Sequence, residues 1–391
     1  MAGYIFNLDN LSSLRQYCEN GVYSTFITSP DGYWKKHHEG TFADYALMKN
    51  GDNVYFFINR KIYGIGELTN VSGECKFNNF PGSSNPENIG YGVVRNQLLW
   101  DEGEWTVKNG KQYTQRWICT FKPSPYIFIN GVDMDDALES NPNKFKMLRA
   151  FWKLSFIRFD DDENQAFKDI LLKKNYLALE DPQHGINIYE DRHEQVHASI
   201  NNKIQNGNYL LDIDPILTSC SNGNILQHEM AIEAGILYQL AHNDDETKNV
   251  LGAWDYISHQ VIASPFKPID YMDKMDLFGY SYIKNYAPTK YNFLVGEIKK
   301  DGAITQDIEQ ILKYVDWVTN EYCYGDYGMI NAILIAYTFN DDVLNYAKEV
   351  GNRMYTIGHR PAKSMKWNDL KLIKYKFNID NHKITFQEIS A

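Results

Sequence analysis

Three residues in the C-terminal half, Asp276, Glu297 and Lys299, have the types and spacing needed for metal-dependent chemistry. Glu297 and Lys299 end the run Phe293-Leu-Val-Gly-Glu-Ile-Lys, which is typical of a buried strand. Side chains alternate along a strand, so both charged groups leave it on the same face. Charged groups beside an apolar strand are costly without a partner or a task. We expect Glu297 to hold a divalent metal while Lys299 lies beside the attacking water.

A neighbouring strand is expected over residues 275–280, with Asp276 near its start. Twenty residues lie between Asp276 and Glu297, enough for a strand, a hairpin turn at 287–289 and the return strand. Two adjacent strands would bring both carboxylates to one metal. Mg²⁺ is usually held by one or two carboxylates together with water and substrate phosphate. We therefore expect Mg²⁺, with Mn²⁺ as a substitute.

Other acids compete for these roles. Asp270 and Asp273 precede Asp276, which is preferred because the strand-like run begins directly after it. A helix is expected over residues 227–240, and it carries two acids four residues apart, Glu229 and Glu233. Acids at this spacing share a helix face, so either could reach the metal. Glu233 is preferred because apolar neighbours anchor its part of the helix in the core: Ile232, Ile236 and Leu240.

The segment after the lysine predicts an amphipathic helix over residues 306–318. Its apolar positions form one packing face, made of Ile308, Ile311, Leu312, Val315 and Val318. Three polar residues are spaced i, i+4 and i+8 on another face: Gln306, Gln310 and Tyr314. The helix thus follows the predicted catalytic strand directly and presents a polar stripe of its own.

The pattern Asp276…Glu297-x-Lys299 resembles the PD-(D/E)xK nuclease superfamily, and the Gln/Tyr helix is similar to the one that follows the catalytic strand in NucS-like and Shedu-like nucleases. The resemblance implies a restriction-endonuclease-like mixed sheet flanked by helices and a Mg²⁺-dependent endodeoxyribonuclease. It implies the catalytic set Asp276, Glu297, Lys299, Gln310 and Glu233. It implies the metal ligands Asp276, Glu297, Ile298 and Glu233.

The N-terminal segment predicts a small barrel of short strands separated by turns. Strands are expected over residues 21–26, 51–58, 61–68, 116–121 and 126–129. The pieces G-V-Y-S-T-F, M-K-N-G-D-N-V-Y-F-F and I-Y-G-I-G-E-L resemble PUA-like barrels of the EVE and YTH type over residues 20–135. That resemblance implies a domain that accepts a flipped, modified base in an aromatic pocket.

The expected base pocket has aromatic walls and small polar contacts to the edge of the base. Trp34 is the preferred wall because it lies in a polar loop, Ser29 to His38. With 8 Trp, 28 Tyr and 20 Phe in the chain, most aromatic side chains belong to cores. The expected base-binding residues are Trp34, Tyr33, Trp105, Trp117, Ser24 and Thr25.

The 391 residues are enough for two domains with their own cores. We expect an α+β chain: a PUA-like barrel with a helical extension over 1–180, a turn-rich linker over 181–224 and the nuclease domain over 225–391. Acids at 160–163 are expected to cap a helix over 166–172. A third core strand is expected over 329–337, a helix over 341–351 and another strand over 353–357, and the segments 371–377 and 383–387 are expected to close the domain.

Composition narrows the setting of the protein. No apolar run is long enough for a membrane span, and the first residues lack a signal-peptide pattern. The five cysteines are scattered along the chain, so we expect no zinc site. The same cysteines favour a reducing cytoplasm, which we expect to be prokaryotic. The net charge of −11 argues mildly against nucleic-acid binding. A local basic stretch, residues 360–376, counters this.

Together these patterns predict a modification-dependent DNA endonuclease of restriction or phage defence, acting on double-stranded DNA that carries a modified base. An alternative is a Shedu-like or DNA-end-sensing defence nuclease that does not distinguish modified bases. A third is a non-catalytic nucleic-acid reader, which the intact Asp276, Glu297 and Lys299 disfavour. Because duplex cleavage needs two active sites or one used twice, the resemblance implies a homodimer.

Overall fold

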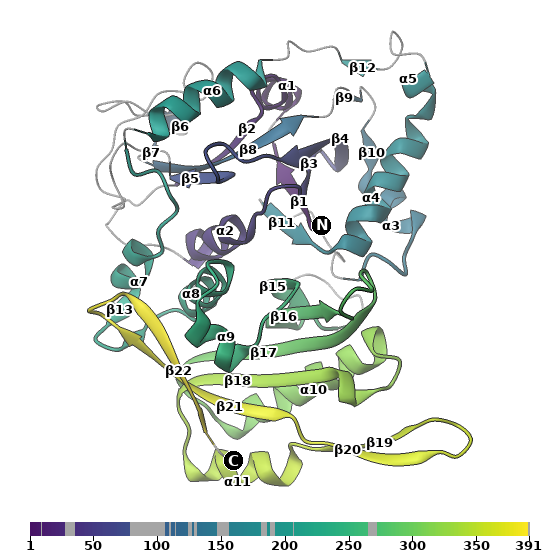
Figure 1. The fold of residues 1–391 in the computed structure, drawn as a ribbon, viewed down its shortest axis with the longest axis vertical. Coiled ribbons are helices and arrows are strands. Elements are labelled where there is room, and N and C mark those ends of the chain that lie inside the picture. The colour runs from purple at the N-terminus through teal and green to yellow at the C-terminus, as the bar shows by residue number, and fades with distance from the viewer. Residues whose placement is uncertain are drawn as a thin grey trace. The chain divides into compact units, whose positions relative to one another are not determined.

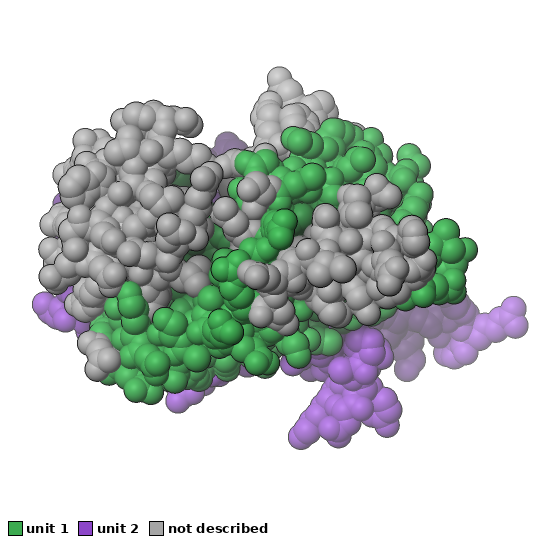
Figure 2. Space-filling view, turned by 90° about the horizontal axis from the view of Figure 1, so that it is seen from above, with its two compact units in different colours: residues 1–215 green, residues 216–391 purple. Residues whose placement is uncertain are grey.

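The computed structural model describes residues 1–8, 10–27, 36–78, 106–108, 111–113, 115–123, 127–128, 131–146, 156–180, 186–187, 192–205, 207–264 and 272–389. The chain divides into two compact units, Met1–Pro215 and Ile216–Ala391 (Figure 2). The division lies inside the interval 181–224 that was expected to be a linker. The assignment of the units as base reader and nuclease stays a prediction.

Unit 1 combines a mixed sheet with helices (Figure 1). Its strands are β1 (Gly3–Asn7), β2 (Val22–Ile27), β3 (Asn53–Ile58), β4 (Lys61–Leu68), β5 (Lys76–Asn78), β6 (Thr106–Lys108), β7 (Lys111–Tyr113), β8 (Gln115–Pro123), β9 (Ile127–Phe128), β10 (Val132–Asp133), β11 (Phe156–Phe159) and β12 (Ile186–Asn187). Its helices are α1 (Leu11–Asn20), α2 (Lys36–Leu47), α3 (Met134–Ser140), α4 (Asp161–Lys174), α5 (Tyr176–Glu180) and α6 (His193–Ile204), and α7 (Asp214–Cys220) spans the division.

The main sheet of unit 1 has the strand order β11-β1-β3-β4-β8-β2, with β10 paired to β4 and β5 paired to β8. One aromatic-rich core, with Tyr55, Phe159 and Phe167 among its residues, joins the sheet to α3 and α4. A second core joins Val22 and Ile118 of the sheet to α6 through Ile200. Helix α6 is therefore an integral part of unit 1, although its segment was expected to belong to a linker.

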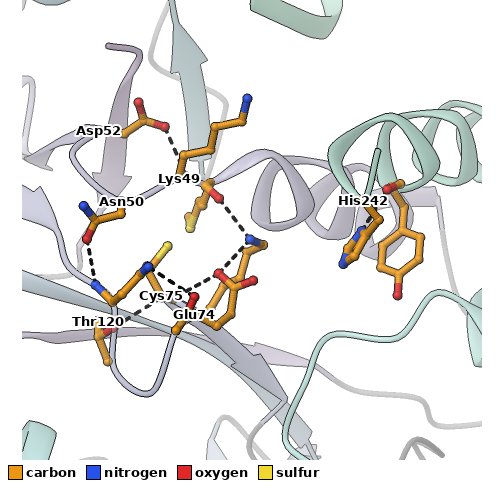
Figure 3. Close-up of polar contacts among 12 residues, drawn as sticks. Lys49, Asn50, Asp52, Glu74, Cys75, Thr120 and His242 are labelled. Atoms are coloured by element: carbon orange, nitrogen blue, oxygen red, sulfur yellow. Dashed lines mark hydrogen bonds and ion pairs between the residues drawn. The ribbon is translucent and has the colours of Figure 1, made fainter. Parts of the chain in front are cut away.

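The turn at Gly51-Asp52, directly before β3, has a structural cause. Gly51 adopts φ +91, a left-handed conformation that favours glycine. The Asp52 carboxylate accepts a hydrogen bond from Lys49 N at 3.2 Å (Figure 3) and another from Ala2 N at 2.9 Å. The turn therefore ties the start of β3 to the start of its parallel partner β1.

Unit 2 holds a mixed six-stranded sheet and its helices (Figure 1). The strands are β13 (Ser221–Asn222), β14 (Ile225–Leu226), β15 (Tyr256–Ile262), β16 (Lys274–Tyr282), β17 (Lys290–Gly302), β18 (Ile330–Thr338), β19 (Arg353–Ile357), β20 (Lys363–Trp367), β21 (Leu370–Asn378) and β22 (Lys383–Ile389). The helices are α8 (Glu229–Ala241), α9 (Asp245–Leu251), α10 (Thr305–Tyr322) and α11 (Asp341–Val350), with a short 3₁₀ turn, η2 (Tyr327–Met329).

The sheet of unit 2 has the order β15-β16-β17-β18-β21-β22. Strands β15, β16 and β17 form an antiparallel meander, whereas β17, β18 and β21 run parallel. Parallel neighbours need a crossover connection, and α10 supplies the one between β17 and β18. The expected α+β class, with a mixed sheet and flanking helices in this unit, is confirmed.

One local prediction is confirmed, and one predicted strand lies outside the main sheet. Asp160 caps α4 by accepting from Glu163 N at 3.0 Å, so the acids at 160–162 satisfy a helix N-terminus, although their carboxylates also lie within 4.8 Å of one another. Strand β19 does not join the six-stranded sheet but pairs with β20 as a separate ribbon.

All five cysteines are free and buried. Burial raises the pKa of the thiols of Cys18 and Cys119 well above the usual range, and it raises the pKa of Cys75 to about 12. Within the described residues, no helix has both the length and the apolar character required to cross a membrane.

Leu334 tests how firmly the sheet supports β17, because it is fully buried and lies opposite Glu297 on the neighbouring strand. Leu334→Ala should lower the free energy of unfolding by about 2–5 kcal/mol, the usual cost of a cavity in a core. Urea unfolding measures the change, with Ile379→Ala as a control because Ile379 is 47% exposed. Equal losses for the two variants would contradict the central position of β18.

Candidate active site

Gln260, Asp276 and Glu297 form one row across three adjacent strands. The antiparallel register of β15 and β16 pairs the residues on either side of Gln260 with those on either side of Asp276, so these two residues lie across from each other. Continuing the register of β16 and β17 by one residue places Asp276 opposite Glu297. Opposite residues on neighbouring strands share a face of the sheet. The hairpin predicted from the sequence is thus present, and it brings the two predicted acids together.

A third carboxylate approaches this row from helix α8. The Gln260 side-chain amide donates to both oxygens of Glu233, at 3.0 and 3.2 Å, and to Asp276 Oδ1 at 2.9 Å. His259 Nδ1 lies 3.2 Å from Glu233 Oε2. Glu233 is 1% exposed. Of the two acids on this helix, Glu233 is therefore the one linked, through the Gln260 amide, to the predicted metal ligand Asp276, whereas Glu229 is half-buried.

Gln260 was not identified from the sequence, yet its backbone marks it as unusual. It adopts φ +53 in the middle of a strand, a left-handed conformation that is costly for residues other than glycine, asparagine and aspartate. Such strain costs roughly 1–3 kcal/mol and persists only where the surrounding contacts enforce it. Here the three hydrogen bonds from its amide to two carboxylates are those contacts.

Glu297 and Lys299 lie on the same face of β17, as strand alternation predicts. Lys299 Nζ donates to Glu297 Oε1 at 2.6 Å and lies 3.7 Å from Asp307 Oδ1, at the start of α10. Asp307 also accepts from Ile304 N through its other oxygen, at 2.8 Å. Sequence reasoning missed Asp307, because an acid in the first turn of a helix is normally explained by capping.

The backbone of Ile298 joins the two acid-bearing strands. Ile298 N donates to Asp276 Oδ2 at 2.8 Å, and the Ile298 side chain is fully buried on the opposite face of the strand. Both oxygens of Asp276 therefore have donors, one from Gln260 and one from Ile298. These two hydrogen bonds fix the orientation of the Asp276 carboxylate beside Glu297.

Burial and crowding of like charges oppose ionisation of these acids. Burial raises the pKa of Asp276 well above its usual range, and the neighbouring carboxylates Glu233 and Glu297 raise it further. Burial raises the pKa of Glu297 to about 7, although Lys299 acts in the opposite direction. Burial lowers the pKa of Lys299, but the attraction and hydrogen bond of Glu297, together with the charges of Asp307 and Glu229, outweigh it and the net shift is upward.

Helix α10 adds a polar pair beside the row. Gln310 Nε2 donates to the hydroxyl of Tyr314 at 2.8 Å, so these two residues share a helix face as predicted. Burial raises the pKa of Tyr314, and the Glu297 and Asp276 charges contribute to that rise. Gln306 is exposed at the start of the helix. All five residues of the predicted packing face, Ile308, Ile311, Leu312, Val315 and Val318, are buried.

The side chains of this site offer the type of donor atom that a hard divalent cation prefers. Glu297 Oε2 is buried and has no hydrogen-bond partner, although buried carboxylate oxygens normally have at least one. The surrounding candidate ligands, Glu233 and Asp276, offer oxygen atoms, and oxygen ligands select Mg²⁺, Mn²⁺ or Ca²⁺ over softer metals. A cation in contact with Glu297 Oε2 would satisfy that oxygen and neutralise the crowded carboxylates.

The predicted base-binding residues are only partly described. Tyr33, Trp34 and Trp105 lie outside the described residues. Ser24 is buried on β2, and Thr25 Oγ1 lies 3.0 Å from the Tyr45 hydroxyl. Trp117 is 2% exposed and packs edge-on against Phe42 inside unit 1. The base pocket stays a prediction.

The raised pKa of Glu297 predicts a stability difference in metal-free protein. With a folded pKa of about 7 and an unfolded value near 4.3, the folded state retains a proton between these values. The free energy of unfolding therefore falls as pH rises through this window. Glu297→Gln cannot ionise, so at pH 8 it should be more stable than the wild type by roughly 1–3 kcal/mol.

Thermal unfolding in EDTA at pH 4, 6 and 8 measures this difference, which should vanish at the lowest pH. Glu309→Gln is the matched control, since Glu309 is an exposed glutamate on α10. A Glu297→Gln protein that is less stable than the wild type at pH 8 would show that ionised Glu297 is well accommodated without metal.

Comparison with known proteins adds little to this geometry. No protein-family model matches the sequence, and no curated protein matches it. Among solved structures, a repair endonuclease from Pyrococcus abyssi aligns over 84% of this chain and 96% of its own, with 13% identity and a TM-score of 0.17. A superposition this loose carries no argument about fold or activity, so the chemistry of this chain has to be judged from its own residues.

Proposed function

We propose that unit 2 is a metal-dependent nuclease that hydrolyses phosphodiester bonds of DNA. The observation that carries this proposal is that Glu297 Oε2 is buried and has no hydrogen-bond partner. Glu297 lies opposite Asp276 on the neighbouring strand, and its other oxygen forms an ion pair with Lys299. Two carboxylates and a lysine in this order on adjacent strands suit the hydrolysis of a phosphate ester, in which negative charge must be neutralised.

Each residue has a separate task in this proposal. Glu297, Asp276 and Glu233 hold the cation, with the Ile298 carbonyl as a further candidate ligand. When bound, Mg²⁺ or Mn²⁺ supplies electrophilic stabilisation of the charge that develops on the phosphate. Lys299 would position the attacking water, and its ammonium would stabilise the same charge.

Neighbouring residues hold these groups in place. Asp307 restrains the ammonium of Lys299 from α10. Gln310 and Tyr314 form a hydrogen-bonded pair on that helix, with the Tyr314 hydroxyl close enough to the acids for their charges to raise its pKa. Gln310 can therefore orient a water or a phosphate oxygen while Tyr314 fixes its amide.

The substrate and the role of unit 1 are finer parts of the proposal. We propose double-stranded DNA as substrate and base recognition by unit 1, in the setting of restriction or phage defence by a homodimer. The competing candidates are a defence nuclease that does not distinguish modified bases and a non-catalytic nucleic-acid reader. The raised pKa of two acids around one lysine favours catalysis, since perturbed groups of this kind cluster at functional sites.

Cleavage assays with Mg²⁺ or Mn²⁺ test the nuclease directly. Glu297→Gln and Lys299→Ala should each reduce cleavage by at least about 100-fold, as expected when a group that stabilises the transition state is removed. Plasmid nicking and linearisation are the readouts. Lys300→Ala is the matched control for the lysine, since Lys300 follows it on the strand, its side chain is 45% exposed, and it should leave cleavage unchanged.

A metal titration separates loss of chemistry from loss of the cation. Glu297→Gln should weaken Mn²⁺ binding, measured by calorimetry, whereas Lys299→Ala should bind Mn²⁺ at least as well as the wild type while failing to cut. Wild-type protein that binds no divalent cation and cuts no DNA would overturn the nuclease.

Matched DNAs test the role of unit 1. Unmodified, cytosine-methylated and glucosylated hydroxymethylcytosine DNAs of one sequence should be cut at different rates if unit 1 selects a modified base. Trp34→Ala should abolish that difference while unit 2 retains its metal affinity. Equal cutting of all three DNAs by the wild type would leave the nuclease standing and remove the modification-dependent role.

A further inference from the structure

We infer that the β19–β20 ribbon is a DNA-binding arm of unit 2. The ribbon leaves the six-stranded sheet and projects away from the rest of this unit (Figure 1). This role depends on the proposed DNA substrate. It specifies a second place on unit 2, outside the row of Gln260, Asp276 and Glu297, where a DNA duplex is bound.

The charge of the ribbon contrasts with that of the chain. Residues 353–367 contain two arginines and two lysines and no acid, whereas the whole protein has a net charge of −11. The innermost cation, Arg353, is used internally, since it donates to both oxygens of Asp316 at 2.7 and 3.0 Å. The other three, Arg360, Lys363 and Lys366, are exposed and make no ion pair within the described part of the chain.

The outer ribbon is exposed on all sides. Every residue from 358 to 366 is exposed. The antiparallel register places Lys363 opposite Ile357 and Lys366 opposite Met354, so the two lysines point to opposite faces of the ribbon, and Arg360 lies at the tip. A two-stranded ribbon fits the major groove of B-DNA, which is about 12 Å wide. Cations on both faces and at the tip can then contact phosphates on both sides of that groove.

Two apolar side chains on the ribbon also suit a position in the major groove of DNA. Met354 is 67% exposed and Met365 is 40% exposed, and they occupy opposite faces according to the register. Exposed methionines on a protruding ribbon are available to contact thymine methyl groups and base edges in the major groove. The major groove of an RNA duplex is too deep and narrow for such contacts, so the ribbon favours DNA.

The base of the ribbon is anchored in the core of unit 2, next to the strand that pairs with β17. Trp367 is 2% exposed and its Nε1 donates to Ile330 O at 2.9 Å. Ile330 is the partner of Phe293 on β17, which lies four residues before Glu297, or about 13 Å along the strand. A single duplex can therefore contact the ribbon while one of its phosphates lies at the catalytic row.

Binding of a labelled 30-base-pair DNA duplex to the full chain, measured by fluorescence anisotropy in EDTA, tests the arm without cleavage. The triple variant R360A/K363A/K366A should bind about 10- to 100-fold more weakly at 100 mM salt. Its plot of log affinity against log salt should be shallower by about 2–3, since each lost phosphate contact contributes about 0.9. The matched control K284A/K348A/K376A removes three exposed lysines of unit 2 and should retain the affinity and salt dependence of the wild type.

Three results would overturn the DNA-binding arm: equal losses for the two triple variants, wild-type affinity of the ribbon variant, or ribbon-dependent binding of anionic phosphatidylserine vesicles in place of DNA. Because the assay needs neither metal nor cleavage, it remains decisive when the nuclease proposal fails. An inactive protein that still binds DNA through the ribbon would retain the arm and lose the catalysis. Unchanged thermal unfolding of both triple variants shows that folding is unaffected.

Discussion

Crowding of buried carboxylates is the constraint on which the rest of unit 2 depends. Asp276 and Glu297 are opposite residues on neighbouring strands, and like charges in that relation are destabilising. Glu233 adds a third acid from α8. The structure offsets the repulsion with nearby donors and one cation: the Gln260 amide between Glu233 and Asp276, the Ile298 backbone N–H on Asp276, and Lys299 on Glu297. One oxygen of Glu297 is left without a partner.

The sheet is arranged so that this crowding occurs at one place. Strand β17 lies where the antiparallel part of the sheet meets the parallel part: it is antiparallel to β16 on one side and parallel to β18 on the other. The antiparallel side brings Asp276 and Gln260 into line. The parallel side needs the α10 crossover, and the start of that helix brings Asp307 to Lys299. The same strand thereby receives polar partners from a meander and from a helix.

Much of this arrangement could be predicted from the sequence, because it depends on the types and spacing of residues that are close together in the chain. The hairpin that joins Asp276 to Glu297 follows from two apolar runs and a turn of the right length, and α10 follows from a regular apolar stripe. Gln260 could not be found in that way, since its importance comes from a left-handed backbone conformation and from contacts made by strand pairing. The ribbon was missed for a similar reason: Arg353–Ile357 has the composition of a core strand, and only the pairing with β20 shows that it leaves the sheet.

The five cysteines also define how the protein can be handled chemically. Thiolates, not thiols, react with alkylating reagents and with disulfides, and burial in apolar surroundings keeps the native thiols protonated and inaccessible. A cysteine introduced at an exposed position, such as Ser364 in the ribbon, would therefore react in preference to the native ones. The wild-type chain is thus already a suitable background for attaching a single fluorophore, spin label or cross-linker without first removing its own cysteines.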